Sequence, residues 1–182
     1  MFNLYVENGP NRKLRCGYTT GTCAAVASKA AVEALLRGKT PESCFVITPK
    51  GIKVEIEIIK KYISGDKTSC SVIKDAGDDI DATDGIEIVS TAEKIETGII
   101  IEGGNGVGKV TKAGLDQPVG SAAINSVPRK MINDCVKEIC EKYGYKDGIK
   151  ITISVPEGEK IAKKTFNPNI GITAVTTVTT AI

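Results

Sequence analysis

Apolar residues recur along the chain with two periods, one typical of helices and one typical of strands, and glycine-rich turns separate the two kinds of segment. Over residues 23–36, alanine, valine and leucine follow the 3.6-residue spacing of a helix with a buried face. Thr20 and Thr22 are both suited to cap this helix, and Gly38 is suited to end it. Its polar positions, which we expect to face water, are Lys29, Glu33 and Arg37.

A second helix is expected to open at Pro128 and to run to about Tyr143, where Gly144 ends it, and a short helix is expected over 159–164. β-Branched runs between turn residues predict strands. The predicted strands span 44–48, 53–60, 68–74, 86–90, 98–102 and 149–155. Because these strands come in hairpin-like runs, without regular alternation with long helices, the sequence predicts an α+β fold. We expect a mixed, largely antiparallel sheet with two principal helices packed on it.

The domain organisation follows from changes in composition along the chain. Residues 1–13 are polar, contain Gly9-Pro10 and predict a flexible N-terminal arm. Residues 14–182 are expected to form one α+β lobe, since no low-complexity linker interrupts them. The last eleven residues, ITAVTTVTTAI, resemble a strand that stops in mid-structure, which suggests a truncated chain.

Charge and residue usage exclude several classes of function. The net charge of +2 has no basic block, so a nucleic-acid partner is not expected. No apolar run is long enough to span a bilayer, so no membrane partner is expected. The six cysteines form no CxxC pair and are interpreted as reduced, mostly buried thiols of a cytoplasmic protein. The absence of histidine removes the usual general base and the commonest metal ligand, and no metal site is predicted.

The start of the first helix has the composition of an anion-binding site. Two glycines and three threonines lie close together there, namely Gly17, Thr19, Thr20, Gly21 and Thr22. Unpaired amides and the positive end of a helix dipole attract carboxylate or phosphate, and Arg15 can add a bidentate clamp. An ordinary capped helix packed by small residues explains the same segment. Arg129, near the expected start of the second helix, is also suited to bind a carboxylate.

The segment KDAGDDIDATDG carries five aspartates. Their spacing does not match a calcium-binding loop, and a solvated acidic turn explains most of them. Asp75 lies at the end of an apolar strand, a position where a carboxylate often faces a cleft. It is therefore the best candidate for a general base.

The segment GGNGVGKVT, residues 103–111, matches two nucleotide-binding motifs incompletely. Lys109 stands where a dinucleotide fingerprint needs glycine, and Val110 stands where a P-loop needs serine or threonine. Two interpretations remain open, a tight turn and a glycine loop that lets a ligand approach the backbone.

Four segments resemble a known family, in the same order along the chain. They are LRCGYTTGTCAAVASKAA, KDAGDDIDATDG, IEGGNGVGKVTKAGLDQPVGSAAINSVPR and VPEGEKIAKKTFNPNIG, and together they cover nearly all of residues 14–172. The family is that of the cobalt-precorrin-5B (C1)-methyltransferases of anaerobic cobalamin biosynthesis, the CbiD family. The resemblance implies methyl transfer from S-adenosylmethionine to carbon C1 of a corrinoid, giving cobalt-precorrin-6A. Cobalt would enter only as part of the substrate.

The resemblance also gives roles to the candidate residues. Corrinoid intermediates carry acetate and propionate groups, which Arg15, Thr19, Thr20, Thr22 and Arg129 are suited to bind. Asp75 or Asp78 would remove or balance a proton in the reaction. The glycines expected to lie against cofactor or macrocycle are Gly103, Gly104, Gly106 and Gly108.

The chain also departs from the family pattern. The pattern continues past Asn167-Pro168 into a glycine-rich strand and a second lobe, whereas this chain continues into ITAVTTVTTAI and is expected to lack that lobe. Asn169 and Ser126 stand where the family usually has arginine and proline. The alternatives are an ATP-dependent small-molecule kinase that uses GGNGVGK, and a non-catalytic corrinoid-binding fragment. Self-association into a homo-oligomer through the threonine-rich end also stays open.

Overall fold

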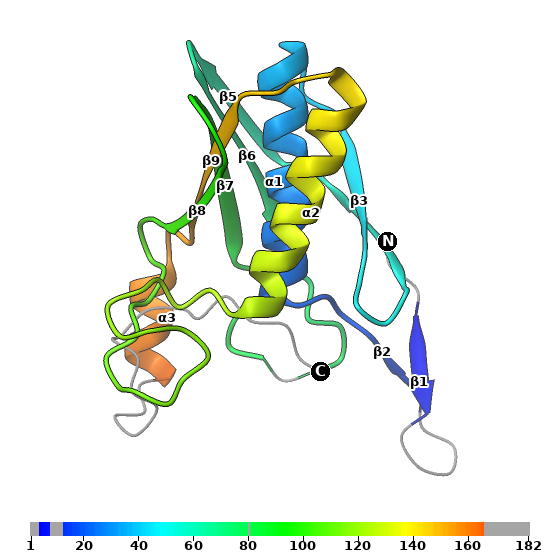
Figure 1. Cartoon of the computed structure of the whole chain (residues 1–182). Helices are drawn as coiled ribbons and strands as arrows, with labels where there is room; N and C mark the ends of the chain where they lie inside the picture. The colour runs from blue at the N-terminus through cyan, green and yellow to red at the C-terminus, as the bar shows by residue number, and fades with distance from the viewer. Residues whose placement is uncertain (1–3, 8–12, 80, 166–182) are drawn as a thin grey trace.

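The computed structural model describes residues 4–7, 13–79 and 81–165, and they form three layers (Figure 1). The first layer is a five-stranded sheet, the second is a pair of long helices, and the third is a two-stranded hairpin. The sheet contains β5 (Lys60–Ser64), β6 (Lys67–Ile73), β7 (Glu87–Ile95), β8 (Ile99–Gly103) and β9 (Gly148–Ser154). The helices are α1 (Thr20–Arg37) and α2 (Ser126–Tyr143), and the hairpin pairs β3 (Ser43–Ile47) with β4 (Lys53–Glu57).

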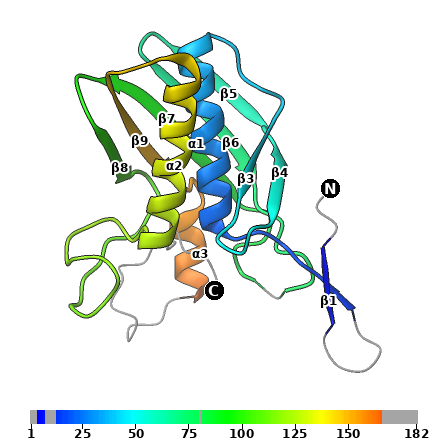
Figure 2. The same ribbon diagram turned by 45° about the vertical axis from the view of Figure 1, so that its right-hand side comes forward.

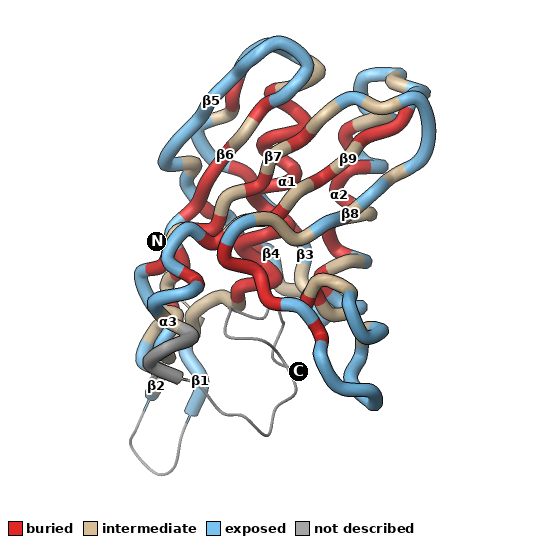
Figure 3. The backbone as a smooth tube through the Cα atoms, turned by 90° about the vertical axis from the view of Figure 1, so that its left-hand side faces the viewer, coloured by how far each residue is buried: buried red, intermediate tan, exposed pale blue. Residues whose placement is uncertain are grey.

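The sheet is mixed and largely antiparallel, with strand order β5-β6-β7-β9-β8. Every neighbouring pair is antiparallel except β8 and β9, which are parallel. Burial alternates along β7 and β9, because successive side chains of a strand point to opposite faces. The buried face lies against the helices, which stand behind the sheet in Figure 3. This arrangement confirms the predicted α+β class.

Helix α1 is buried on all sides, although the pattern predicted one buried face. Residues 20–34 are all buried, because the sheet, α2 and the β3–β4 hairpin surround the helix (Figure 2). Its small residues allow this close packing. The hydroxyl of Ser28 donates to the carbonyl of Ala24 at 2.7 Å and lies 2.9 Å from the Ser90 hydroxyl of β7.

The expectation that Lys29 and Glu33 face water is therefore wrong. Lys29 Nζ lies 2.7 Å from Glu138 Oε1 on α2, and the Tyr143 hydroxyl donates to Glu33 Oε1 at 2.8 Å. Burial alone would raise the pKa of Glu33, but hydrogen bonds from Tyr143, Lys142 and Arg37 outweigh it and hold the pKa below its usual value.

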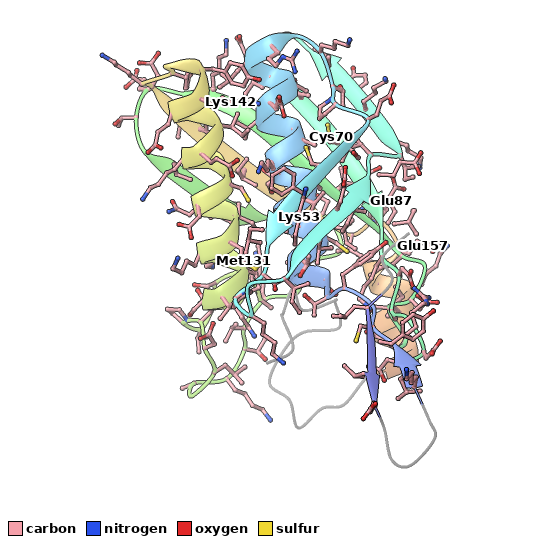
Figure 4. All side chains as sticks on the ribbon, turned by 90° about the vertical axis from the view of Figure 1, so that its right-hand side faces the viewer. Lys53, Cys70, Glu87, Met131, Lys142 and Glu157 are labelled. Carbon is pink, nitrogen blue, oxygen red and sulfur yellow. The ribbon has the colours of Figure 1, made fainter. Side chains whose placement is uncertain are left out.

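Helices α1 and α2 run in the same direction. The contacts advance by four residues on both helices, from Lys29–Glu138 to Glu33–Lys142. Figure 4 shows the two labelled ends of α2, with Met131 near its beginning and Lys142 near its end. Both long helices consequently begin at the same end of the molecule.

The predicted elements are present, with shifted bounds and three additions. The additions are β5, β1 (Tyr5–Glu7) and β2 (Lys13–Arg15). Strand β1 lies within residues 1–13, which were expected to form a flexible arm, and it pairs with β2, which begins at the end of that segment. The cap of α1 is Thr19, instead of Thr20 or Thr22, whereas Gly38 ends the helix as predicted, with a φ of 69°. The short helix α3 spans Gly158–Thr165. The threonine-rich segment 172–182 lies outside the described residues.

Candidate functional site

One end of the molecule gathers the features that bind ligands in mixed folds. Helices α1 and α2 both begin there, and the loop between β6 and β7 lies beneath the start of α1 (Figures 1 and 2). Helix N-termini carry partial positive charge and unpaired amides. This end is therefore the best-suited place for an anionic ligand.

The segment that leads into α1, residues 15–18, crosses the β6–β7 loop so closely that the two backbones are in contact. The Tyr18 amide donates to the Asp75 carbonyl at 2.9 Å, and the Asp78 amide donates to the Arg15 carbonyl at 3.0 Å. A Cβ on Gly17 would lie 2.1 Å from the carbonyl carbon of Ala76. A Cβ on Gly77, whose φ is +70°, would lie 2.3 Å from the Arg15 carbonyl oxygen. Only glycine at both positions permits this crossing.

Arg15 and Asp75 form a bidentate ion pair at the crossing. Arg15 Nη1 lies 2.5 Å from Asp75 Oδ2, and Nη2 lies 2.7 Å from Oδ1. Asp75 Oδ1 also accepts the Gly77 amide at 2.8 Å. The hydrogen bonds from Arg15 lower the pKa of Asp75, against the opposing effect of burial. Asp75 is thus held ionised, and the Arg15 guanidinium already binds a carboxylate of its own chain.

Two adjoining hollows open beside this crossing. The polar hollow, of about 500 Å³, is lined by Arg15, Thr20, Lys74, Asp78, Asp79 and Asp81, among others. The apolar hollow, of about 610 Å³, is lined by Leu4, Pro49, Ile52, Val54 and Val127, among others. Both are also lined by Val6, Cys16, Gly17, Tyr18, Thr19 and Lys50, so the two hollows are neighbours, and together they are called the cleft. The cleft joins a charged half to an apolar half.

The three threonines at the start of α1 are not equivalent. Thr19 caps the helix by accepting the Thr22 amide at 3.2 Å, and the Thr19 and Thr22 hydroxyls lie 3.1 Å apart. Thr20 is 5% exposed and lines the polar hollow, and its hydroxyl makes no hydrogen bond within the described residues. Thr20 is the threonine that offers a free donor to a ligand.

Sequence reasoning missed two lysines of the cleft. Lys50, in the β3–β4 turn, lines both hollows, but the sequence indicated only a turn there. The Lys74 ammonium is buried and lies 2.7 Å from Asp81 Oδ2. Burial would raise the pKa of Asp81, yet hydrogen bonds from Lys74 and Thr83 hold it below its usual value. Across residues 4–7, 13–79 and 81–165, no group of three or more cysteine, aspartate or glutamate side chains is arranged to hold a metal ion.

The glycine-rich loop packs against its own protein. A Cβ on Gly103 would lie 2.7 Å from Ala122 Cβ, one on Gly104 would lie 2.4 Å from Ser154 Oγ, and one on Gly106 would overlap the Val155 carbonyl oxygen. Gly106 and Gly108 are buried. Neighbouring protein atoms therefore account for Gly103, Gly104 and Gly106, and these glycines do not form an open cradle for S-adenosylmethionine. Their role in cofactor binding stays a prediction.

Arg129 is occupied by backbone carbonyls. Its Nε donates to the Ile124 carbonyl at 2.8 Å, and its Nη1 donates to the Ile101 carbonyl at 2.9 Å. Burial lowers the pKa of its guanidinium. Arg129 is not among the residues that line the two hollows. The fold thus brings Arg15, Thr19, Thr20, Asp75 and Asp78 together and sets Arg129 and the glycine-rich loop apart.

Comparison with known proteins places these features in a family. The CbiD family model matches residues 7–177. The chain belongs to the CbiD family. It is 54% identical over 173 residues to a cobalt-precorrin-5B C(1)-methyltransferase of Ruminiclostridium cellulolyticum, and 51% identical over 172 residues to one of Clostridium perfringens. These alignments cover 95% and 94% of this chain but 44% and 46% of the relatives.

A solved CbiD structure has the same fold. The crystal structure of a cobalamin biosynthesis protein (cbiD) from Archaeoglobus fulgidus superposes with a TM-score of 0.69 at 33% identity. The superposition covers 97% of this chain and 55% of that one. The chain thus spans about half the length of the family members that it matches. Among the described residues, no helix is long and apolar enough to cross a membrane.

Proposed function

We propose that this chain takes part in the methylation of carbon C1 of cobalt-precorrin-5B by S-adenosylmethionine, which yields cobalt-precorrin-6A, and that its cleft binds the corrinoid. Membership of the CbiD family supports the reaction, as do the names of its relatives as cobalt-precorrin-5B C(1)-methyltransferases. The cleft supports the ligand. A corrinoid combines an apolar macrocycle with carboxylate side chains, and the cleft combines an apolar half with a helix N-terminus and Lys50.

The reaction makes modest demands on protein side chains. An electron pair of the macrocycle forms the bond to the methyl carbon while the carbon–sulfur bond breaks and S-adenosylhomocysteine leaves. The protein must hold the two reactants in line and accept any proton that the macrocycle releases. Asp78 is the better proton acceptor, because it lines the polar hollow, whereas Asp75 is committed to Arg15. Asp75 is then a positioning residue.

The kinase alternative finds no support in the loop that suggested it. A P-loop must lead directly into a helix whose N-terminus faces the phosphates. Here Lys109 pairs with Ala122 in an isolated bridge, and α2 begins only at Ser126. The Asp116 carboxylate already accepts the Ser126 amide and hydroxyl at that helix start. A non-catalytic corrinoid-binding fragment stays the second candidate, because the chain spans under half of the curated relatives' length.

Calorimetric titration separates these functions. The chain would be titrated with dicyanocobyrinic acid, a corrinoid with free carboxylates, with S-adenosylmethionine, and with ATP plus magnesium. We expect saturable binding of the corrinoid and none of ATP. Binding of S-adenosylmethionine as well would place a donor site within the chain, and its absence would favour the corrinoid-binding fragment. Binding of ATP alone, or of none of the three, would refute the proposal.

A further inference from the structure

The start of α1 presents unpaired donors to the polar hollow. The Thr22 amide is taken by Thr19 Oγ1, and the Cys23 amide by the Thr19 carbonyl. The amides of Thr20 and Gly21 have no acceptor within the described residues, as is usual for the first positions of a helix. The Thr20 hydroxyl is also free, although the residue is 95% buried (5% exposed) and lines the hollow. A carboxylate in the hollow can accept hydrogen bonds from this hydroxyl and from the Thr20 amide.

The cations around the cleft differ in their availability. Arg15 is bound to Asp75, and Lys74 is bound to Asp81. Lys50 is exposed at the tip of the β3–β4 hairpin, and its ammonium has no partner among the described residues. Lys50 is among the residues that line both hollows. It is the cation of the cleft that a ligand can recruit without breaking an ion pair of the fold.

The negative charges of the cleft lie on a different element. Asp78 and Asp79 belong to the β6–β7 loop, whereas the free donors belong to α1 and to the β3–β4 turn. Asp78 Oδ2 accepts the Arg15 amide at 2.7 Å. Asp79 is exposed, its carboxylate has no partner in the described part of the chain, and this charge would repel an anion.

We infer that the polar hollow is a carboxylate-binding subsite formed by the Thr20 hydroxyl, the Thr20 amide and the Lys50 ammonium, all of which belong to residues that line it. Arg15 is a positioning residue that fixes the crossing beneath this subsite and does not bind the ligand. The identity of the ligand as a side-chain carboxylate of the corrinoid rests on the proposed function; the subsite itself rests on the free donors.

The test uses a small polycarboxylate, so that it does not depend on corrinoid binding. Citrate would be titrated into ¹⁵N-labelled protein while the amide resonance of Thr20 is followed. We expect saturable shifts at this amide, and dissociation constants about tenfold weaker in Lys50→Gln and in Thr20→Val, since each variant loses a charge-assisted contact. Thr20→Ser should restore binding, and Asp79→Asn should tighten it about twofold by removing a repulsive charge.

Matched controls exclude general effects of charge and folding. Lys137→Gln removes an exposed lysine of α2 and should leave the titration unchanged. Unaltered amide spectra of the other residues would show that each variant is folded. Absence of shifts at Thr20 in the wild-type chain, or equal affinity of Lys50→Gln and wild type, would overturn the subsite.

A parallel titration separates the subsite from the proposed function. Dicyanocobyrinic acid would be compared with its heptamethyl ester, in which every carboxylate is blocked. If the wild-type chain binds the acid more tightly than the ester, and Lys50→Gln binds both equally, the carboxylate in the subsite belongs to the corrinoid. Both proposals would then be supported. Citrate shifts at Thr20 without binding of either corrinoid would support the subsite and refute the corrinoid as its ligand.

Discussion

At the scale of single residues, chemistry depends on which partner a side chain already has. Asp75 has the residue type and the strand-end position expected of a general base, yet its carboxylate is held by Arg15 and the Gly77 amide. Thr20 lies one residue from the cap, and its hydroxyl has no hydrogen-bond partner within the described residues. The sequence named Arg15 and Thr20 as substrate-binding candidates and Asp75 as the best general-base candidate. It could not show that Arg15 and Asp75 bind each other, because the pair joins positions 60 residues apart.

The Arg15–Asp75 pair predicts a specific pH dependence of stability. The pKa of Asp75 is lowered in the folded state from its ordinary value of 3.8, so the pair stabilises the fold above that pH and its contribution is lost as the pH falls through the folded pKa. We expect Asp75→Asn to lower the free energy of unfolding at pH 7 by about 1 kcal/mol, since the pair is partly exposed to solvent. The difference should shrink as the pH falls below 3.8.

Urea unfolding of both proteins between pH 7 and pH 3 measures this difference. Asp79→Asn is the matched control, because Asp79 is an exposed aspartate of the same loop. It should follow the wild-type stability across the range. A difference between wild type and Asp75→Asn that grows as the pH falls would contradict the assignment.

At the scale of elements, α1 is a central helix and not an amphipathic one. Its apolar positions predicted a helix correctly, because apolar residues that recur every 3.6 residues fit a helix and do not fit the two-residue repeat of a strand. The burial of Lys29 and Glu33 could not be predicted, since their partners lie on α2, 109 or 110 residues further along the chain. Strand β5 was missed for a related reason. All five of its residues are exposed, so it lacks the alternation that identifies a strand.

Lys29 gives a test of how the two helices are held together. Its side chain is 7% exposed, lies 4.5 Å from the Phe45 ring centroid and pairs with Glu138, which is 55% exposed. Replacing a buried charge by an apolar side chain of similar size is often nearly neutral, whereas removing only its partner leaves an uncompensated charge. We expect Lys29→Met to change the free energy of unfolding by less than about 1 kcal/mol, and Glu138→Ala to lower it by about 2 kcal/mol.

Urea titration at neutral pH compares the two variants directly. Glu141→Ala, which removes an exposed glutamate from the same helix, controls for the change in helix propensity and should have little effect. If Lys29→Met were the more damaging change, the ion pair itself would hold the helices together, and the buried-charge argument would fail.

At the scale of the whole molecule, the three-layer packing determines which thiols reach solvent. All six cysteines are free, as the sequence predicted; Cys23, Cys44, Cys70 and Cys135 are buried, while Cys16 and Cys140 are partly exposed. Burial raises the pKa of Cys23 to about 12 and that of Cys70 to about 11, which suppresses the reactive thiolate. The sequence indicated buried thiols in general, but only the packing around α1 decides which ones.

This difference makes cysteine labelling a probe of both fold and cleft. We expect two fast-reacting thiols in the native protein with Ellman's reagent at pH 8, Cys16 and Cys140, with Cys140 the slower because burial raises its pKa. The other four should react only on unfolding.

Cys16 lines both hollows, so a bound corrinoid should slow its labelling and leave the labelling of Cys140 unchanged. Mass spectrometry of the labelled peptides, with Cys140 as the internal control, measures both effects. Protection of Cys140 together with Cys16 would indicate global stabilisation, and fast labelling of any buried thiol would contradict the packing around α1.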